Sequence, residues 1–200
     1  MTDPSFFDVV LHQRACRDYT DAPVPDADVE RMLEAATHAP SGENTQPWVF
    51  VVIRDAEVRS AIVELTRRIW LGARGEAMSR LGTRLAIEVD EGFQRGFGGA
   101  PVLVVVAADT NTGVHRNAMP SSIFPAVQNL LLAANALGYG SALTTLTAVA
   151  GDELRALIDL PGHVVPMAVV PIGRPARPLG PPRRRPATGT AHRDRYGQGW

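Results

Sequence analysis

A polar loop between a helical pattern and an apolar strand constrains the fold more than any other stretch of this chain. The loop covers residues 39–48 (APSGENTQPW), and the strand pattern follows at 49–53 (VFVVI). A rigid scaffold often presents polar groups to a ligand from such a connection. Small Ser41 and Gly42 let a backbone approach a flat or charged group, and Asn44 offers a paired donor and acceptor. The alternative is an ordinary helix-to-strand loop whose side chains satisfy their own backbone.

Helical and strand patterns mix along the rest of the chain without a strict alternation. Apolar residues recur at helical spacing over 26–37 and 124–137, and again after a helix-capping Asp55. Short apolar runs of strand length occupy 102–108 and 164–172. This order predicts an α+β fold with a mixed β-sheet flanked by helices.

Two further stretches bear on where a ligand would bind. Near the start, Phe7, Val10 and Leu11 fall at i, i+3 and i+4, which predicts a short helix with one buried face. Residues 70–99 contain a second helical pattern and then four glycines close to their end. We expect a long irregular segment there, of the kind that often covers a binding site.

An arginine-rich tail follows the last predicted strand. Residues 174–200 hold seven arginines and one acid, Asp194, whereas the whole chain has a net charge of -1 and no lysine. Such a tail suits nucleic acid, a phosphate-bearing ligand or the acidic face of a partner subunit. It lacks regularly interleaved aromatic and basic residues, so nucleic acid is the least favoured of the three. We therefore divide the chain into a domain, 1–173, and a tail, 174–200.

Composition excludes several classes of protein. A hydrophobic share of 45% supplies a sizeable core, and no apolar run approaches the roughly 20 residues that cross a bilayer. The start shows no basic segment followed by an apolar one. The single cysteine, Cys16, excludes an internal disulfide and suggests a reducing compartment. We expect a cytoplasmic protein that does not bind membranes.

The chain carries groups for binding an anion and no evident catalytic side chain. Arg14 and Arg17 lie three residues apart, so they either converge on one anion or are separately solvated. The five histidines show no metal-ligand spacing, and no Gly-x-Ser-x-Gly nucleophile motif is present. We expect no metal and no nucleophile, which is typical of a protein whose cofactor performs the reaction.

Three stretches of the chain resemble the nitroreductase family of FMN-dependent oxidoreductases. They are 14–19 (RACRDY), 39–48 and 128–141 (QNLLLAANALGYGS), followed in order by 169–173 and 183–186. The first is similar to the family's R-S-x-R-x-F, and the second to its A-P-S-S-x-N-x-Q-P-W. The match covers nearly the whole chain, and the second stretch is the most specific.

The resemblance implies a nitroreductase-like fold and an interlocked homodimer with two FMN sites at the subunit interface. It implies an FMN contact for each of these residues: Arg14, Ala15 and Arg17; Pro40, Ser41, Gly42 and Asn44 of the partner subunit; Leu143 and Thr144; and Arg183 and Arg185 of the tail. A backbone N–H within 142–145 would meet flavin N5. The alternative for the tail arginines is a solvated basic run.

The chain departs from the family pattern at two cofactor positions. Gln13 stands where members often have Arg, and Ala15 stands where they have Ser. Either change weakens FMN binding or shifts the charge requirement to Arg184. Glu43 occupies a position on the substrate side of the flavin, or is simply a solvated carboxylate. Residues 70–97 match nothing in the family and are interpreted as a substrate-specific lid.

The function that the resemblance implies is that of an FMN-dependent oxidoreductase. NAD(P)H would give a hydride to flavin N5, and a small nitroaromatic or quinone-like acceptor would then take the electrons in a ping-pong cycle. One alternative keeps the fold and changes the flavin reaction to dehalogenation, flavin cleavage or ring oxidation. Another is a flavin-binding protein without turnover. The sequence does not distinguish NADH from NADPH.

Overall fold

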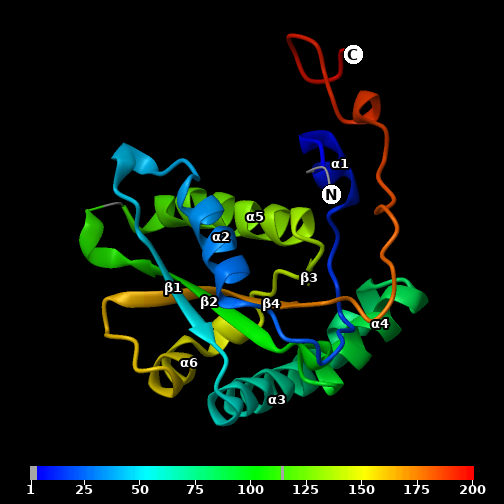
Figure 1. Ribbon diagram of the computed structural model, residues 1–200. Helices are drawn as coiled ribbons and strands as arrows, with labels where there is room; N and C mark the ends of the chain where they lie inside the picture. The colour runs from blue at the N-terminus through cyan, green and yellow to red at the C-terminus, as the bar shows by residue number, and fades with distance from the viewer. Residues whose placement is uncertain (1–3, 114) are drawn as a thin grey trace.

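A four-stranded sheet lies between two layers of helices in the computed structural model, which describes residues 4–113 and 115–200 (Figure 1). The strands are adjacent in the order β1 (Trp48–Ile53), β2 (Val102–Asp109), β4 (Val164–Gly173) and β3 (Gly140–Ser141). Neighbouring strands pair antiparallel, and a parallel bridge joins Ala15 to Ser141. The expected α+β fold, a sheet flanked by helices, is confirmed.

The second strand serves two hydrophobic cores. Successive side chains of a strand point to opposite faces, so Val104 enters one core and Val105 the other. The first core is covered by α2 (Asp26–Thr37) and α5 (Met119–Ala136), and the second by α3 (Ala56–Arg80) and α6 (Gly151–Leu157). The continuous apolar run at 102–108 is thereby explained, because both of its faces are covered.

Helix α5 spans the molecule and begins five residues earlier than the predicted 124–137. Near its start, the Ser122 hydroxyl accepts a hydrogen bond from the Gly42 N–H at 3.2 Å. Near its end, Asn135 Nδ2 donates to the Val9 carbonyl at 3.0 Å. Helix α5 therefore separates the loop at 39–48 from the N-terminal segment.

Neither α5 nor any other helix in the described ranges combines the length and apolarity that a bilayer crossing requires.

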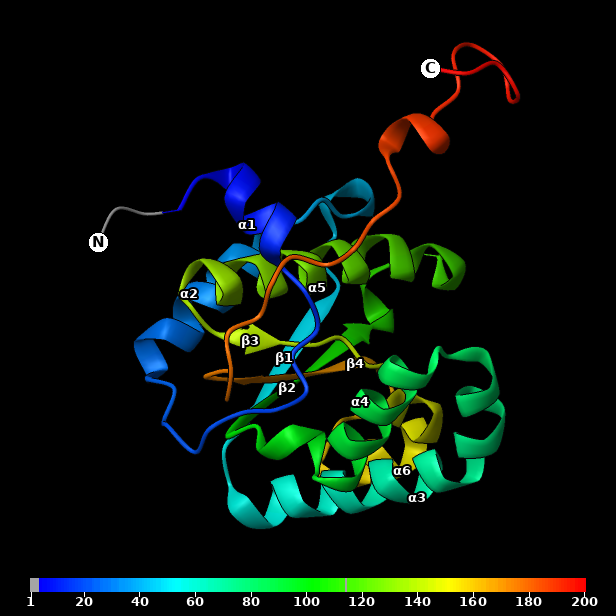
Figure 2. The same ribbon diagram turned by 90° about the vertical axis from the view of Figure 1, so that its right-hand side faces the viewer.

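The second helical pattern within 70–99 is confirmed, but the expectation of a long irregular segment there is wrong. Helix α3 continues to Arg80, and α4 (Thr83–Gln94) packs against it, as Figure 2 shows. Gly72 and Gly75 lie within α3, where no neighbouring atom approaches the place of a Cβ. Glycine lowers helix propensity by about 1 kcal/mol, and packing against α4 outweighs that cost here. Whether this hairpin covers a substrate stays a prediction.

The first helix, α1 (Phe6–His12), is amphipathic, but its apolar face is open in the single chain. Ser5 caps it, and only Val9 is buried. The side chains expected to be buried are exposed instead, with Phe7 at 71%, Val10 at 40% and Leu11 at 61%. The predicted buried face is therefore wrong for one chain, and an uncovered apolar surface remains.

The tail begins along the N-terminal segment and then leaves the body. The Thr20 N–H donates to the Arg174 carbonyl at 2.9 Å, and the Ala176 N–H donates to the Asp18 carbonyl at 3.0 Å. Beyond Gly180 the chain is almost entirely exposed and extends past α1 (Figures 1 and 2). Of the tail, 174–200, only residues 174–180 thus pack against the body of the domain.

Candidate functional site

The segment that carries both N-terminal arginines is fixed by close backbone contacts. The Cys16 N–H donates to the Ser141 carbonyl at 2.9 Å, and the Tyr19 N–H donates to the Gly98 carbonyl at 3.0 Å. A Cβ on Gly98 would lie 2.0 Å from the Arg17 carbonyl oxygen, and the residue has a φ of +67°. Only glycine fits both conditions, so Gly98 sets the position of Arg17.

Two more glycines support the same segment. A Cβ on Gly140 would lie 2.7 Å from Cys16 Sγ, and one on Gly92 would lie 3.2 Å from Arg17 Cβ. The sequence pattern of glycines near the end of 70–99 indicated flexibility. The structure shows instead that these residues let α4 and the 3₁₀ turn Phe97–Gly99 approach the arginine segment closely.

Buried side chains beneath the arginines are held neutral. The Tyr19 hydroxyl donates to the Cys16 carbonyl at 2.9 Å. Burial raises the pKa of Tyr19 well above its ordinary value and also raises the pKa of the Cys16 thiol. Both groups are therefore protonated at neutral pH, and Cys16 is no thiolate nucleophile.

A basic cleft of about 260 Å³ lies between this segment, α4 and the start of the tail, and five arginines and three acids line it. Asp18 pairs with Arg95 at 2.9 Å, while Glu88 pairs with Arg84 at 3.1 Å. Arg14 donates to the Gly180 carbonyl at 3.3 Å. Neither Arg14 nor Arg17 forms an ion pair within the described residues, so both charges are available to an anion such as phosphate.

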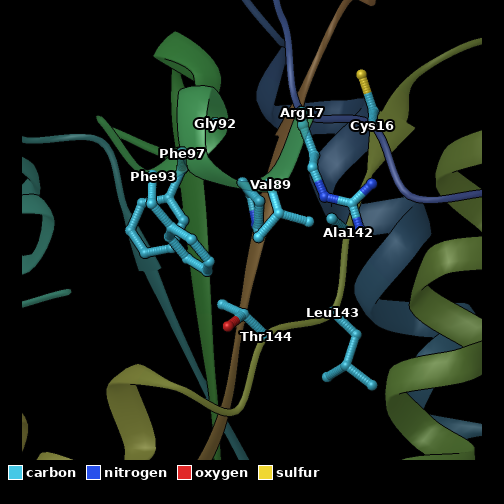
Figure 3. Close-up of a pocket in the computed structure, with 10 residues that line it drawn as sticks. Cys16, Arg17, Val89, Gly92, Phe93, Phe97, Ala142, Leu143 and Thr144 are labelled. Atoms are coloured by element: carbon cyan, nitrogen blue, oxygen red, sulfur yellow. The ribbon is translucent and has the colours of Figure 1, made fainter. Parts of the chain in front are cut away.

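An apolar cavity of about 100 Å³ adjoins the cleft and shares Cys16 and Arg17 with it. Figure 3 shows the Arg17 guanidinium directed towards Ala142, while Phe93 and Phe97 lie side by side across the cavity. Leu143 and Thr144 form its floor. Burial lowers the pKa of Arg17, but arginine stays cationic in proteins. Arg17 therefore places a positive charge at the junction of an anion cleft and an apolar slot.

The loop at 39–48 is strained and exposed. Three of its non-glycine residues have positive φ: Glu43 at 52°, Asn44 at 55° and Gln46 at 49°. Ser41 Oγ accepts from the Gln46 N–H at 3.1 Å, so part of the loop's polarity is satisfied within it. Clusters of backbone strain are typical of functional sites. Asn44 is a residue type that tolerates this conformation, but nothing in the residue types of Glu43 or Gln46 indicates the strain.

Within one chain, the loop and the N-terminal segment that leads to the two arginines lie near opposite ends of α5 (Figure 1). The 13 residues from Ser122 to Asn135 correspond to roughly 20 Å of helix. The structure thus brings Arg14, Ala15, Arg17, Leu143 and Thr144 together. It does not bring Pro40, Ser41, Gly42, Glu43 or Asn44 to them.

The tail arginines also lie outside both cavities. Arg183 and Arg185 are exposed beyond Gly180, and neither lines the cleft or the apolar slot. The described residues contain no cluster of potential metal ligands. The expected phosphate contact of Arg183 and Arg185 therefore stays a prediction.

Helix α4 supplies site residues that the sequence analysis missed. Arg84, Glu88, Glu91 and Arg95 are spaced at i, i+4, i+7 and i+11 and line the basic cleft. Val89, on the neighbouring stripe, lines the apolar slot with Gly92 and Phe93. The helical spacing of the charges was the available signal, and it was obscured by the nearby glycines.

Comparison with known proteins gives one family. The family model described as the nitroreductase family matches residues 10–174. A proposed NADH dehydrogenase/NAD(P)H nitroreductase of Archaeoglobus fulgidus is 31% identical over 172 residues, which cover 84% of this chain and 83% of that protein. Rat iodotyrosine deiodinase 1 is 28% identical over 189 residues, which are 88% of this chain and 64% of the deiodinase.

Solved structures agree with the sequence matches. A proposed nitroreductase from Desulfovibrio desulfuricans, solved in complex with FMN, superposes with a TM-score of 0.76 at 28% identity. The superposition covers 98% of this chain and 99% of that one. With the family model matching most of the chain and the fold shared from end to end, the chain belongs to the nitroreductase family.

Proposed function

We propose that this protein is an FMN-dependent oxidoreductase that uses NAD(P)H to reduce small nitroaromatic or quinone-like acceptors. The observation that carries the proposal is a basic cleft and an apolar slot that meet at Arg17. FMN has a flat ring and a phosphate, so it needs one pocket of each kind. The FMN complex of the Desulfovibrio desulfuricans relative supports the same cofactor here.

The residues present fit this cofactor. Arg14 would hold the phosphate, and Arg17 would face the polar edge of the ring beside Ala15. Leu143 lines the apolar slot, and its backbone N–H has no hydrogen-bond acceptor among residues 4–113 and 115–200, so it is free to meet a ring nitrogen. Arg183 and Arg185 would bring further positive charge to the phosphate, and Arg184 would offset the charge missing at Gln13.

The complete site would need a second copy of the chain. Ser41, Gly42 and Asn44 lie too far from the cleft to share one ring with Arg17 in the same chain. A two-fold symmetric homodimer can place the partner's loop there twice, once for each site. The exposed apolar face of α1 supports such an interface, because a second chain would cover it. Tail residues 174–200 would complete the FMN site or the dimer.

The chain contributes binding, charge and exclusion of water rather than a reacting side chain. Bound FMN would supply the redox chemistry that links hydride transfer from NAD(P)H to reduction of a second substrate in a ping-pong cycle. Arg17 stabilises negative charge on the ring edge, and Phe93 and Phe97 keep the slot apolar. Protons can come from solvent. We place this chemistry in the cytoplasm, where NAD(P)H is available and Cys16 stays reduced.

An absorbance spectrum tests the proposal directly. Purified protein, supplied with FMN, should show flavin bands that bleach under anaerobic NADPH or NADH. The bands should return when a nitroaromatic or a quinone is added. Protein that takes up no FMN, or bound FMN that neither nucleotide reduces, would refute the proposal.

The deiodinase relative favours a second candidate, reductive dehalogenation on the same fold. Iodide release from 3-iodotyrosine by the chemically reduced holoprotein would support it over nitro reduction. A flavin-binding protein without turnover is the remaining alternative. It predicts bound FMN but no steady-state oxidation of NADPH or NADH with nitroaromatic, quinone or halogenated acceptors.

A further inference from the structure

One carboxylate joins the two helices of the 56–94 hairpin. Arg74 on α3 donates to both oxygens of Asp90 on α4, from Nε to Oδ1 at 2.8 Å and from Nη2 to Oδ2 at 2.6 Å. Trp70 Nε1 donates to the same Oδ1 at 2.8 Å. The Asp90 side chain is only 15% exposed. Three charge-assisted hydrogen bonds therefore fix the middle of α4 relative to α3.

The same contact orders an aromatic row that leads into the apolar slot. The ring of Trp70 lies 4.9 Å from that of Phe93, which in turn lies 6.2 Å from that of Phe97. Phe93 and Phe97 form the wall of the slot opposite Arg17 (Figure 3). Because a helix residue cannot move alone, the hydrogen bonds of Asp90 also set the positions of Phe93 and its neighbours.

The end of α4 has a separate attachment. Arg67 Nη2 donates to the Gln94 carbonyl at 2.8 Å, and this bond does not involve Asp90. The loss of Asp90 would therefore loosen residues 84–93, while the helix stays attached at its last residue, Gln94. The cleft residue Glu88 lies on the freed part, but neither Arg14 nor Arg17 does.

From this geometry we propose that Asp90 is a positioning residue. It holds the α4 wall of the apolar slot so that a flat substrate can lie between Phe93 and the flavin ring. The inference rests on the proposed function, because it assumes a flavin in the slot. Asp90 should therefore affect the binding of both flat substrates, the nicotinamide and the acceptor, and should leave the binding of the FMN phosphate unchanged.

Hydrogen exchange tests the positioning role without relying on flavin chemistry. Asp90→Ala should speed amide exchange across 84–93 at least tenfold, both before and after FMN is added. Asp90→Asn keeps an oxygen for Trp70 but turns an amide towards Arg74, so its effect should be smaller. The matched control is Asp152→Asn on α6. The Asp152 side chain is 94% exposed, and its substitution breaks an ion pair in which Arg155 Nη2 lies 3.0 Å from Asp152 Oδ1. That variant should leave α4 unchanged.

Steady-state kinetics test the consequence for substrates. Asp90→Ala should raise KM for NAD(P)H and for the acceptor about tenfold, while kcat and the FMN Kd change less than twofold. Asp90→Asn and Arg74→Met should each raise both KM values about threefold. The Asp152→Asn control should match the wild type.

Two results would overturn the inference. One is unchanged exchange across 84–93 in Asp90→Ala. The other is a parallel fall of FMN affinity, kcat and thermal midpoint, which indicates a merely structural role. If the wild type takes up no FMN, the proposed function fails, and the exchange result alone supports or overturns the positioning role of Asp90.

Discussion

The two motif segments of this chain, 14–19 and 39–48, are built in opposite ways. The first is packed against Gly92, Gly98 and Gly140, and its hydrogen bonds close within one chain. In the second, Ala39 and Pro47 are buried, but most residues between them are exposed and three non-glycine residues have positive φ. One half of the proposed site is thus preorganised by close packing within its own chain, whereas the other half is a strained, mostly exposed loop.

This difference has an energetic meaning. A non-glycine residue at positive φ costs on the order of 1–3 kcal/mol, and it persists only where surrounding structure holds it. In the loop, the Gly42 to Ser122 hydrogen bond supplies part of that support. A partner subunit and a ligand would supply the rest. The arginine segment needs no such help, and we expect mutations in the two segments to behave differently.

The largest effect is expected at the packed segment. In Gly98→Ala, the new Cβ would lie 2.0 Å from the Arg17 carbonyl oxygen and would overlap it. Residue 98 also has a φ of +67°, which alanine rarely adopts. The chain must shift to relieve this, so we expect a loss of about 3 kcal/mol or more in the free energy of unfolding. Urea denaturation measures it, and FMN uptake should fall with it.

A matched glycine provides the control. Gly75→Ala lies inside α3 with no atom near the added Cβ, so stability should rise by about 0.5–1 kcal/mol. Equal effects of the two substitutions would show that Gly98 does not hold the arginine segment.

The next effect concerns Arg17 itself. Arg17→Gln removes the positive charge at the junction of the two pockets and should leave the fold intact. A hydrogen bond to a charged group contributes about 1.5–3 kcal/mol, which corresponds to a roughly 10- to 150-fold weaker FMN Kd. Flavin fluorescence titration measures the Kd. Arg80→Gln, which only breaks an exposed pair with Glu76, should leave it unchanged. An unaltered Kd in Arg17→Gln would exclude Arg17 from the cofactor site.

A smaller effect sharpens the comparison between the two segments. Asn44→Ala should weaken FMN binding about fivefold, the value of one ordinary hydrogen bond of about 1 kcal/mol. In mixed dimers of Arg17→Gln and Asn44→Ala chains, one of the two sites would contain only wild-type contacts. Half of the sites should then bind FMN with wild-type affinity. Two weakened sites with no wild-type site, one about 10- to 150-fold and the other about fivefold weaker, would mean that both segments act within one chain.

The sequence predicted the fold class and the helices after residues 26 and 55, because these depend on local periodicity. It failed on the 70–99 segment. Glycines there indicated a flexible loop, but Gly92 and Gly98 are used for close packing against Arg17, which is a long-range contact. The spacing of glycines along the chain does not reveal which distant residue packs against each of them.

Sequence reasoning also failed where a second chain would complete the structure. The apolar spacing of Phe7, Val10 and Leu11 predicted a buried face, yet the single chain leaves that face exposed. The cleft residues of α4 were missed for a related reason, because their role appears only once α4 is placed beside the arginine segment. The strain at Glu43 and Gln46 has no counterpart in their residue types.

The smallest expected effect is a gain in stability, opposite in sign to the loss expected for Gly98→Ala. Glu43→Gly relieves a φ of +52° at an exposed position, so stability should rise by about 0.5 kcal/mol after the entropy cost of glycine. The matched control is Glu30→Gly in α2, where glycine should cost about 1 kcal/mol. Thermal unfolding of both variants with and without FMN measures the two changes. If Glu43→Gly gains stability only in the absence of FMN, the strained loop is itself part of the binding site. A loss of stability in both states would show that the loop carries no strain, and the contrast between the two segments would then rest on exposure alone.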